Sequence, residues 1–534
     1  MNPLSSTRPA GREILLSAAL LLALALAIYM PHIVRGGWYS DDWIHVAAMS
    51  EAGGLFDAIG AMSERTHRPG LAVSLSLFHA IAGEGQAGYL VIGAILAAAQ
   101  AWLFYLMLRV LGLRATVAGA AAAIFVVLPI IDSTRLWMAA FPIQVSGMLY
   151  LLGVLVALHG VSNVRGRRAV VWHLGAGVLY FAAVLTYELV AGLVALAPLL
   201  YAVHAGWRPA SRRILPDLAA IGLALAVLVS RGAENREADL APGALWDRAV
   251  QTADQAEVVF RWLFPWPDVV AGPIGLLVLL AGMLGAGIAI GRGDDSGRSL
   301  AEWAKIAGLA ALFTLAGLVM LLPADPYFVP RISGMGNRTG AFAAFGAVLL
   351  LIALIVLALA GLGALLRRPR LGFLLAAAMV AVTGLNLAAR ELRHQEPWAD
   401  SWQQQQQIVA ATDTALDGRL PAGSAVISFG HTTYILPDDI SVFANAWDFR
   451  GALWETYDQP DVTAQPWQEG MVCGPAGVVA PDAGGSTSGS EPYPYRRLAF
   501  FNAATSTADP VRSRAACEAA VGEILGVPVA PAQP

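Results

Sequence analysis

Residues 38–45 read WYSDDWIH and place two adjacent carboxylates, Asp41 and Asp42, between aromatic side chains. Like charges side by side repel each other. Such a pair is retained where water solvates it, where cations pair with it, or where it binds a metal or takes up a proton. Ser-Asp-Asp is also a favourable helix start, so capping of the following helix is the alternative. Binding of a divalent metal, Mg²⁺ or Mn²⁺, by the two carboxylates is left open.

The chain that must position this pair is strongly apolar. Of its 534 residues, 57% are hydrophobic and 13% are charged, which is more apolar surface than a soluble protein of this length can bury. Several charge-free stretches reach the length of about 20 residues that a helix needs to cross a bilayer. The composition therefore predicts an all-α polytopic membrane protein. Basic residues form short clusters and no nucleic-acid-binding stripe.

We expect about eleven transmembrane helices by the length criterion, and ten or twelve stay open. The first, 13–34, is read as an uncleaved span. Arg-rich clusters in the loops orient the spans with the N-terminus in the cytoplasm, following the positive-inside rule. The spans are expected near residues 13–34, 88–111, 115–131, 137–159, 171–187, 189–206, 214–230, 268–291, 302–323, 340–365 and 371–389.

Two domains are expected. Residues 1–390 form a transmembrane domain whose first external loop covers 35–86, and the segment RPGLAVSLSLFHAIAG within that loop is predicted to be an interfacial helix. Residues 391–534 change character, with short β-like runs such as SAVISF and a helix-like RSRAACEAAVGEILG. They predict a small mixed α/β domain on the external side.

The chain has two cysteines, Cys473 and Cys517, and both lie in this second domain. A disulfide between them is expected if the domain is outside the cytoplasm. Two unpaired buried thiols are the alternative.

The order of these features resembles that of the GT-C glycosyltransferases. These include protein O-mannosyltransferases, lipid A aminoarabinose transferases and bacterial lipid-linked glucosyltransferases. The resemblance covers nearly the whole chain, but the motifs that carry it are short. They are SDDW at 40–43, HRPG at 67–70, TYE at 186–188 and PYFVPRISGMGNR at 326–338.

The resemblance implies transfer of a sugar from a polyprenyl phosphate to an acceptor hydroxyl, with inversion of the anomeric centre. A hydroxyl is a poor nucleophile at neutral pH, so a carboxylate must take its proton as the attack proceeds. Asp41 is assigned as that base and Asp42 as its helper or as a metal ligand, and the order could be swapped.

The leaving phosphate needs positive charge. Arg331 and Arg338 stand where related enzymes place phosphate-binding arginines, and Tyr327 and Asn337 are expected to add hydrogen bonds. The alternative is that these arginines contact lipid head groups. Arg135 is expected either to touch the donor or to form an ion pair with Asp132.

Three further residues are expected to border the substrate cavity. His67 and Arg68 begin the interfacial helix, where aminoarabinose transferases have a proline-rich segment, so the subfamily stays open. Glu188 lies in the apolar stretch LTYELVAG. A carboxylate at membrane depth is costly, so it is expected to orient an acceptor, bind sugar hydroxyls or pair with an Arg of the cavity. A position at the lipid–water boundary is the alternative.

The predicted function is therefore sugar transfer on the outer face of a bacterial inner membrane. The expected partners are a polyprenyl-phosphate sugar, membrane lipids, and a glycan, lipid-linked saccharide or protein acceptor. A transporter or flippase of lipid-linked saccharides is the first competitor, but it predicts charges deep inside several spans. A non-catalytic membrane scaffold is the second, and an O-antigen ligase or polymerase the third.

Overall fold

The computed structural model describes residues 10–163, 167–232, 241–263, 299–323, 328–435, 439–481 and 491–525. The chain divides into two compact units. The membrane unit comprises Met1–Val34 and Met62–Glu396, and the C-terminal unit comprises Arg35–Ala61 and Pro397–Pro534. The expected boundary at 390 is close to the division at Glu396, whereas residues 35–61 group with the C-terminal residues.

Every described secondary-structure element of the membrane unit is a helix. α3 (Leu55–Arg65) and α16 (Pro369–Ala415) are shared between the two units. The other helices of this unit are α1 (Gly11–Arg35), α4 (Pro69–Ala82), α5 (Gln86–Val110), α6 (Ala115–Val126), η1 (Pro129–Ile131), α7 (Ser133–Leu136), η2 (Met138–Ala140), α8 (Phe141–Asn163), α9 (Arg167–Thr186), η3 (Glu188–Val190), α10 (Ala191–Ala205), α11 (Trp207–Ser230), α12 (Pro242–Leu263), α14 (Leu300–Val319), η7 (Met335–Gly340) and α15 (Ala343–Leu365).

The polytopic prediction is confirmed by helix length and composition. Within the described residues, nine helices are long and apolar enough to cross a membrane. The predicted span 115–131 is corrected, because α6 has 12 residues and ends at Val126, before the short turn η1 that begins at Pro129. The predicted span 268–291 lies outside the described residues. The interfacial segment forms α4, an apolar helix of 14 residues.

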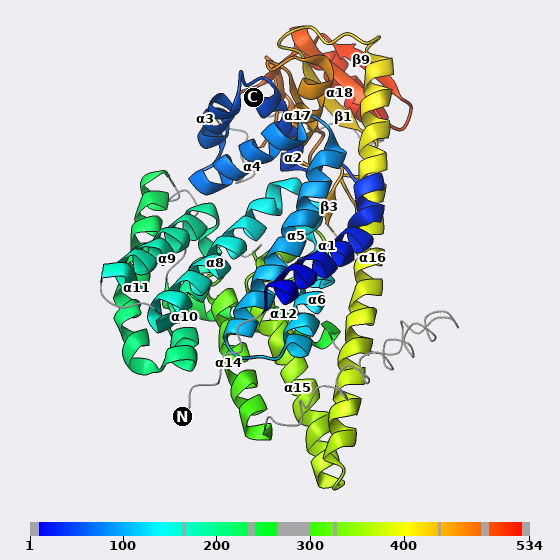
Figure 1. Ribbon diagram of the computed structural model, residues 1–534. Coiled ribbons are helices and arrows are strands. Elements are labelled where there is room, and N and C mark those ends of the chain that lie inside the picture. The colour runs from blue at the N-terminus through cyan, green and yellow to red at the C-terminus, as the bar shows by residue number, and fades with distance from the viewer. Residues whose placement is uncertain are drawn as a thin grey trace. The chain divides into compact units, whose positions relative to one another are not determined.

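Glycines let consecutive membrane helices approach closely. A Cβ added to Gly317 of α14 would lie 2.3 Å from the backbone nitrogen of Ala343, and one added to Gly346 of α15 would lie 2.4 Å from that of Thr314. Small residues commonly permit such contacts between membrane helices. α14 and α15 therefore pack side by side, as do α8 with α9 and α10 with α11 (Figure 1).

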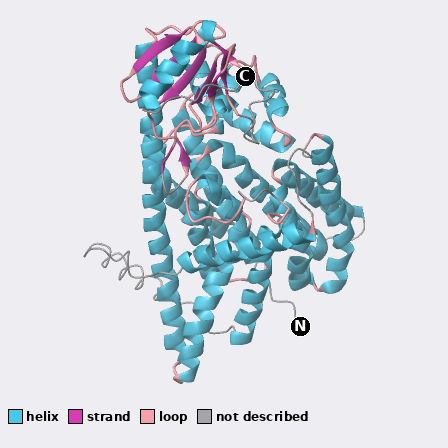
Figure 2. Ribbon diagram, turned by 180° about the vertical axis from the view of Figure 1, so that it is seen from behind, coloured by secondary structure: helices cyan, strands magenta, loops and turns pink. Residues whose placement is uncertain are grey.

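The C-terminal unit contains all described strands, magenta in Figure 2, and so confirms the predicted mixed α/β part. Its main sheet has the order β4-β1-β8-β9, in which β1 pairs in parallel with β4 and β8, and β9 is antiparallel to β8. Its elements are α2 (Asp41–Ser50), β1 (Ala425–Phe429), β2 (Tyr434–Ile435), β3 (Ile440–Ser441), α17 (Ala446–Tyr457), β4 (Thr463–Pro466), β5 (Val472–Cys473), β6 (Gly477–Val479), β7 (Tyr493–Pro494), η8 (Tyr495–Arg497), β8 (Leu498–Asn502), β9 (Thr507–Val511) and α18 (Arg514–Leu525).

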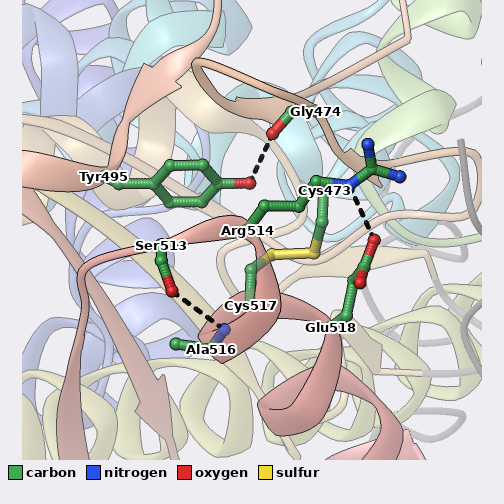
Figure 3. The surroundings of a disulfide bond; sticks show 8 residues. All are labelled: Cys473, Gly474, Tyr495, Ser513, Arg514, Ala516, Cys517 and Glu518. Carbon is green, nitrogen blue, oxygen red and sulfur yellow. Dashed lines mark hydrogen bonds and ion pairs between the residues drawn. A yellow bond between two sulfur atoms is a disulfide. The ribbon is translucent and has the colours of Figure 1, made fainter. Parts of the chain in front are cut away.

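Cys473 of β5 and Cys517 of α18 form a disulfide in the core of this unit (Figure 3). Both sulfur-bearing residues are buried, and their Cα atoms are 6.0 Å apart, within the range that a disulfide spans. Of the two alternatives that the sequence left open, a disulfide and two unpaired thiols, the structure has the disulfide. The bond ties α18 to the small sheet β5-β6-β7.

Candidate active site

The aspartate pair begins α2, in the C-terminal unit. Ser40, just before it, has a φ of 47°, a region that residues other than glycine rarely adopt and that often marks a functional site. Asp42 is fully buried, and its Oδ2 accepts a hydrogen bond of 3.0 Å from the backbone N–H of Tyr39. Asp41 is half-buried. The two carboxylates therefore have different tasks, since Asp42 stabilises the helix start and Asp41 is the more accessible.

α17 packs against α2 and contacts it at three points along one face. Near its start, the indole Nε1 of Trp447 donates to Asp41 Oδ1 at 2.8 Å. One turn later, a Cβ added to Gly451 would lie 2.4 Å from the backbone nitrogen of Ile44. Near its end, the indole of Trp454 donates to Glu51 at 2.8 Å. The spacing i, i+4, i+7 puts Trp447, Gly451 and Trp454 on one helix face.

A buried carboxylate fixes the start of α17. Asp448 accepts hydrogen bonds from the backbone N–H groups of Asn445 (3.0 Å) and Phe449 (2.8 Å) and from Ser441 Oγ (2.7 Å). The pKa of Asp448 is raised to about 7, mainly by burial and to a smaller extent by the charge of Asp41, against the lowering effect of these bonds. The carboxyl is therefore sensitive to the ionisation of its neighbour.

Aromatic residues hold the pair against the part of α16 that belongs to the C-terminal unit. Trp43 stacks on Trp402 with ring centroids 5.6 Å apart, and its Nε1 donates to Gln405 at 2.6 Å. Tyr39 contacts Trp398 edge to face at 4.9 Å. Edge-to-face and stacked pairs of this kind stabilise beyond the area they bury. The aromatic flanks of the SDDW motif are thus structural anchors of α2.

In the membrane unit, Arg68 pairs with Glu188. Its Nε donates to Glu188 Oε2 at 2.6 Å, its Nη2 donates to Oε1, and its guanidinium lies 4.4 Å from the ring centre of Tyr187. Glu188 is therefore paired with an arginine, Arg68, which is one of the roles expected for it. His67 precedes this pair and is half-buried.

The loop that contains η7 carries the other two expected arginines. Arg331 packs on Gly336, where an added Cβ would lie 2.6 Å from its Cδ. Arg338 donates to the carbonyl of Met335 at 2.5 Å. Both side chains therefore contact the same turn, at residues 335 and 336, and remain half-buried. Tyr327, expected to assist them, lies outside the described residues.

Asn337 of the same loop is fully buried, and its amide is used within the protein. It accepts from the backbone N–H and the hydroxyl of Ser133, and it donates to Asp132 Oδ1 at 2.6 Å and to the carbonyl of Pro129 at 3.0 Å. The other oxygen of Asp132 accepts from His394 Nδ1 at 2.9 Å, and burial raises the pKa of Asp132. Asn337 thus holds the loop onto α7 and has no capacity left for a substrate.

Arg135 is likewise turned inward. Its Nη1 donates to the carbonyl of Val126 at 2.7 Å and to Tyr29 Oη at 2.9 Å, and its Nη2 donates to the carbonyl of Phe125. These carbonyls belong to the last turn of α6, where backbone acceptors lack helical partners. Arg135 therefore caps α6. It does not pair with Asp132 in any contact found among the described residues.

For a divalent metal, the aspartate pair offers two neighbouring carboxylates, Asp41 and Asp42. The described residues contain no group of three or more His, Cys, Asp or Glu side chains that could hold a metal ion. The oxygens of Asp41 and Asp42 also turn to different donors, an indole and a backbone N–H.

Beside the loop of η7, the membrane unit has a large apolar pocket that is open on one side. Its volume is about 1020 Å³, and it is lined mainly by aliphatic residues of α10, α11, α12, α14 and α15. Ile130, Pro330 and Gly340 form its border with η1 and with the arginine-bearing loop. A chain of isoprene units would match this lining chemically.

No protein-family model matches the sequence, and no curated protein matches it at a significant level. The chain is similar to solved structures of two proteins, among others. One is the oligosaccharyltransferase AglB from Archaeoglobus fulgidus in complex with an inhibitory peptide and a dolichol-phosphate, with 13% identity and a TM-score of 0.44. The other is ArnT from Cupriavidus metallidurans bound to undecaprenyl phosphate, with 14% identity and a TM-score of 0.34.

The match covers 85% of this chain and 64% of AglB, and 83% of this chain and 84% of ArnT. This chain therefore spans less than two thirds of the length of AglB. An AglB complex with Zn and sulfate also matches, with a TM-score of 0.42.

Several residues of the site were not expected from the sequence. Trp447 and Gly451 carried no motif, although Asn445 and Asp448 have the N-x-x-D spacing of a capping box and could have marked the start of α17. His394 stands alone in a polar stretch of α16, and no local signal pairs it with Asp132.

Proposed function

We propose that the protein transfers a sugar from a polyprenyl-phosphate donor to an acceptor hydroxyl, with Asp41 as general base. The observation that supports this proposal best is the hydrogen bonding of the Asp41 carboxylate. Oδ1 accepts from Trp447 at 2.8 Å and from Ser40 Oγ at 3.3 Å. For Oδ2, no hydrogen-bond partner is found among the described residues. One oxygen is thus fixed while the other is left to accept a proton.

The reaction is a single displacement. The acceptor oxygen forms a bond to the anomeric carbon while the bond from that carbon to the phosphate oxygen breaks, and the hydroxyl proton passes to Asp41. The polyprenyl phosphate leaves with the electron pair, and the anomeric centre inverts. Asp42 supports this step indirectly, because its bond to the Tyr39 N–H holds the start of α2.

The membrane unit supports the lipid-linked class of donor. The apolar pocket next to the η7 loop is suited to an isoprenoid chain, and Arg331 and Arg338 are on that loop. Guanidinium groups stabilise developing phosphate charge through charge-assisted hydrogen bonds. We assign these two arginines to the leaving phosphate and place the reaction at the external face of a bacterial inner membrane.

The test is sugar transfer by purified protein in nanodiscs, with a panel of polyprenyl-phosphate sugars and cell-envelope glycan, lipid-linked saccharide and peptide acceptors. Asp41→Asn should lower kcat by about 10²–10⁴-fold, the range of general-base catalysis. Asp57→Asn, an exposed aspartate of α3, is the control and should transfer normally. Unchanged transfer by Asp41→Asn overturns the base assignment. Absence of transfer by the unmodified protein with every donor overturns the proposed function in favour of a transporter or scaffold.

A further inference from the structure

We infer that Trp447 is a positioning residue, which holds the carboxylate of Asp41 in its working orientation through the indole N–H. The inference rests on the proposed function and adds to it a residue of α17 that contacts Asp41 from 406 positions away in the sequence. It makes α17 the element that controls the geometry of the base.

The first argument is the rotation of the carboxylate. An aspartate side chain turns readily about its last torsion, which is broad and roughly two-fold. The bond from Trp447 holds Oδ1 at 2.8 Å, whereas the bond from Ser40 Oγ is longer, at 3.3 Å. Trp447 is therefore the stronger restraint that keeps Oδ1 in place and leaves Oδ2 directed elsewhere.

The second argument is that Trp447 is itself held in place. Asn445 and Asp448 form a capping box that fixes the start of α17. Trp447 lies between these two residues in the sequence. Gly451, one turn later, brings the backbone of α17 against Ile44 of α2. A larger residue at Gly451 would push the helices apart and lengthen the bond to Asp41.

The third argument separates positioning from stability. The side chain of Trp447 is 47% exposed, and an exposed hydrogen bond contributes little to folding because water can replace it. Trp454 makes the same kind of bond to Glu51 but is 5% exposed. The bond of Trp447 therefore adds little to folding stability but contacts the proposed base. The buried bond of Trp454 adds to stability and does not contact the base.

The experiment compares Trp447→Phe with Trp454→Phe in the full-length protein. Trp447→Phe keeps an aromatic ring and loses the N–H. It should lower kcat about tenfold, the effect of losing one charge-assisted hydrogen bond, with the acceptor KM changed less than about twofold and Tm unchanged. Trp454→Phe should lower Tm and leave kcat within about twofold. Trp447→His, which restores a ring N–H, should recover part of kcat.

The outcomes are distinguishable from failure of the proposed function. If Asp41→Asn abolishes transfer while Trp447→Phe retains the kcat of the unmodified protein, the positioning role is wrong and the function stands. If Trp447→Phe and Trp454→Phe lose Tm and kcat in parallel, Trp447 is only structural and the inference is overturned. A protein in which Asp41→Asn transfers normally overturns the base assignment, and the positioning role with it.

Discussion

Arg68 and Glu188 are 120 residues apart and form a two-point ion pair in the membrane unit, with Nε to Oε2 at 2.6 Å. A close backbone contact allows it. A Cβ added to Gly70 of α4 would lie 2.2 Å from Thr186 Oγ1 at the end of α9. The start of α4 is thereby brought against the junction of α9 and η3, and the Arg-Pro and TYE motifs meet there.

Breaking this pair should destabilise the protein. The side chains are 9% and 22% exposed, so removing one partner leaves a largely buried charge, and Arg68→Gln or Glu188→Gln should each cost about 2 kcal/mol, between the values for exposed and fully buried pairs. A double-mutant cycle, measured by denaturation in detergent, should give a coupling free energy of about 1–2 kcal/mol. Glu64→Gln, at an exposed position of α3, is the control. A coupling near zero would show that the pair contributes nothing.

Asn337 should act on stability rather than on substrate binding. Asn337→Ala leaves the N–H of Ser133 and the carboxyl of Asp132 without their buried amide partner, which should cost about 2–3 kcal/mol. Asn386→Ala is the matched control, because neither polar atom of this buried amide has a partner among the described residues. The control should be neutral or stabilising by equilibrium denaturation. A donor KM that rises for Asn337→Ala without loss of stability would contradict the structural role.

Asp448 should give the C-terminal unit a stability that depends on pH. Its pKa is raised by burial to about 7 in the folded state, against about 3.9 in an unfolded chain. Between these two pKa values the folded state binds more protons than the unfolded state. The contribution of Asp448 to the free energy of unfolding is therefore fully present below about pH 4 and is lost as the pH rises to about 7.

Asp448→Asn should remove this dependence, since an amide keeps hydrogen-bonding capacity and does not ionise. Chemical denaturation of the full chain, followed by tryptophan fluorescence from pH 4 to 8, measures it. The unmodified protein should lose a few kcal/mol across this range, and the variant should show a flatter profile. Equal slopes in the two proteins would exclude Asp448 as the source.

The sequence predicted what depends on local composition. Hydropathy located most of the membrane helices, because a span is a local property of about 20 residues. It placed a span at 115–131 although the helix stops at Val126, because the apolar run continues through Pro129 into short turns. The mixed α/β nature of the C-terminal part was also evident from its short apolar runs.

The arrangement of the candidate site could not be predicted in the same way. Hydrophobic periodicity does not show that α17 contacts α2, because Trp447 and Asp41 are 406 residues apart. Nor could residue type separate the arginines. Arg135 was expected to meet either a phosphate or Asp132, and the structure uses it to cap α6. A cation near the end of a helix can serve the backbone as well as a ligand.

The disulfide should stabilise the C-terminal unit and report on its compartment. Cys473 and Cys517 are separated by 44 positions, so the loop-entropy relation gives about 4 kcal/mol. The double variant Cys473→Ala/Cys517→Ala should therefore make the peptides of β5 and α18 more accessible to protease in the full chain. Cys473→Ala alone should produce a thiol at Cys517 that reacts only after unfolding. If the unmodified protein, isolated without reductant, already contains two titratable thiols, the bond does not form in the cell and the expected external location of this unit loses its support.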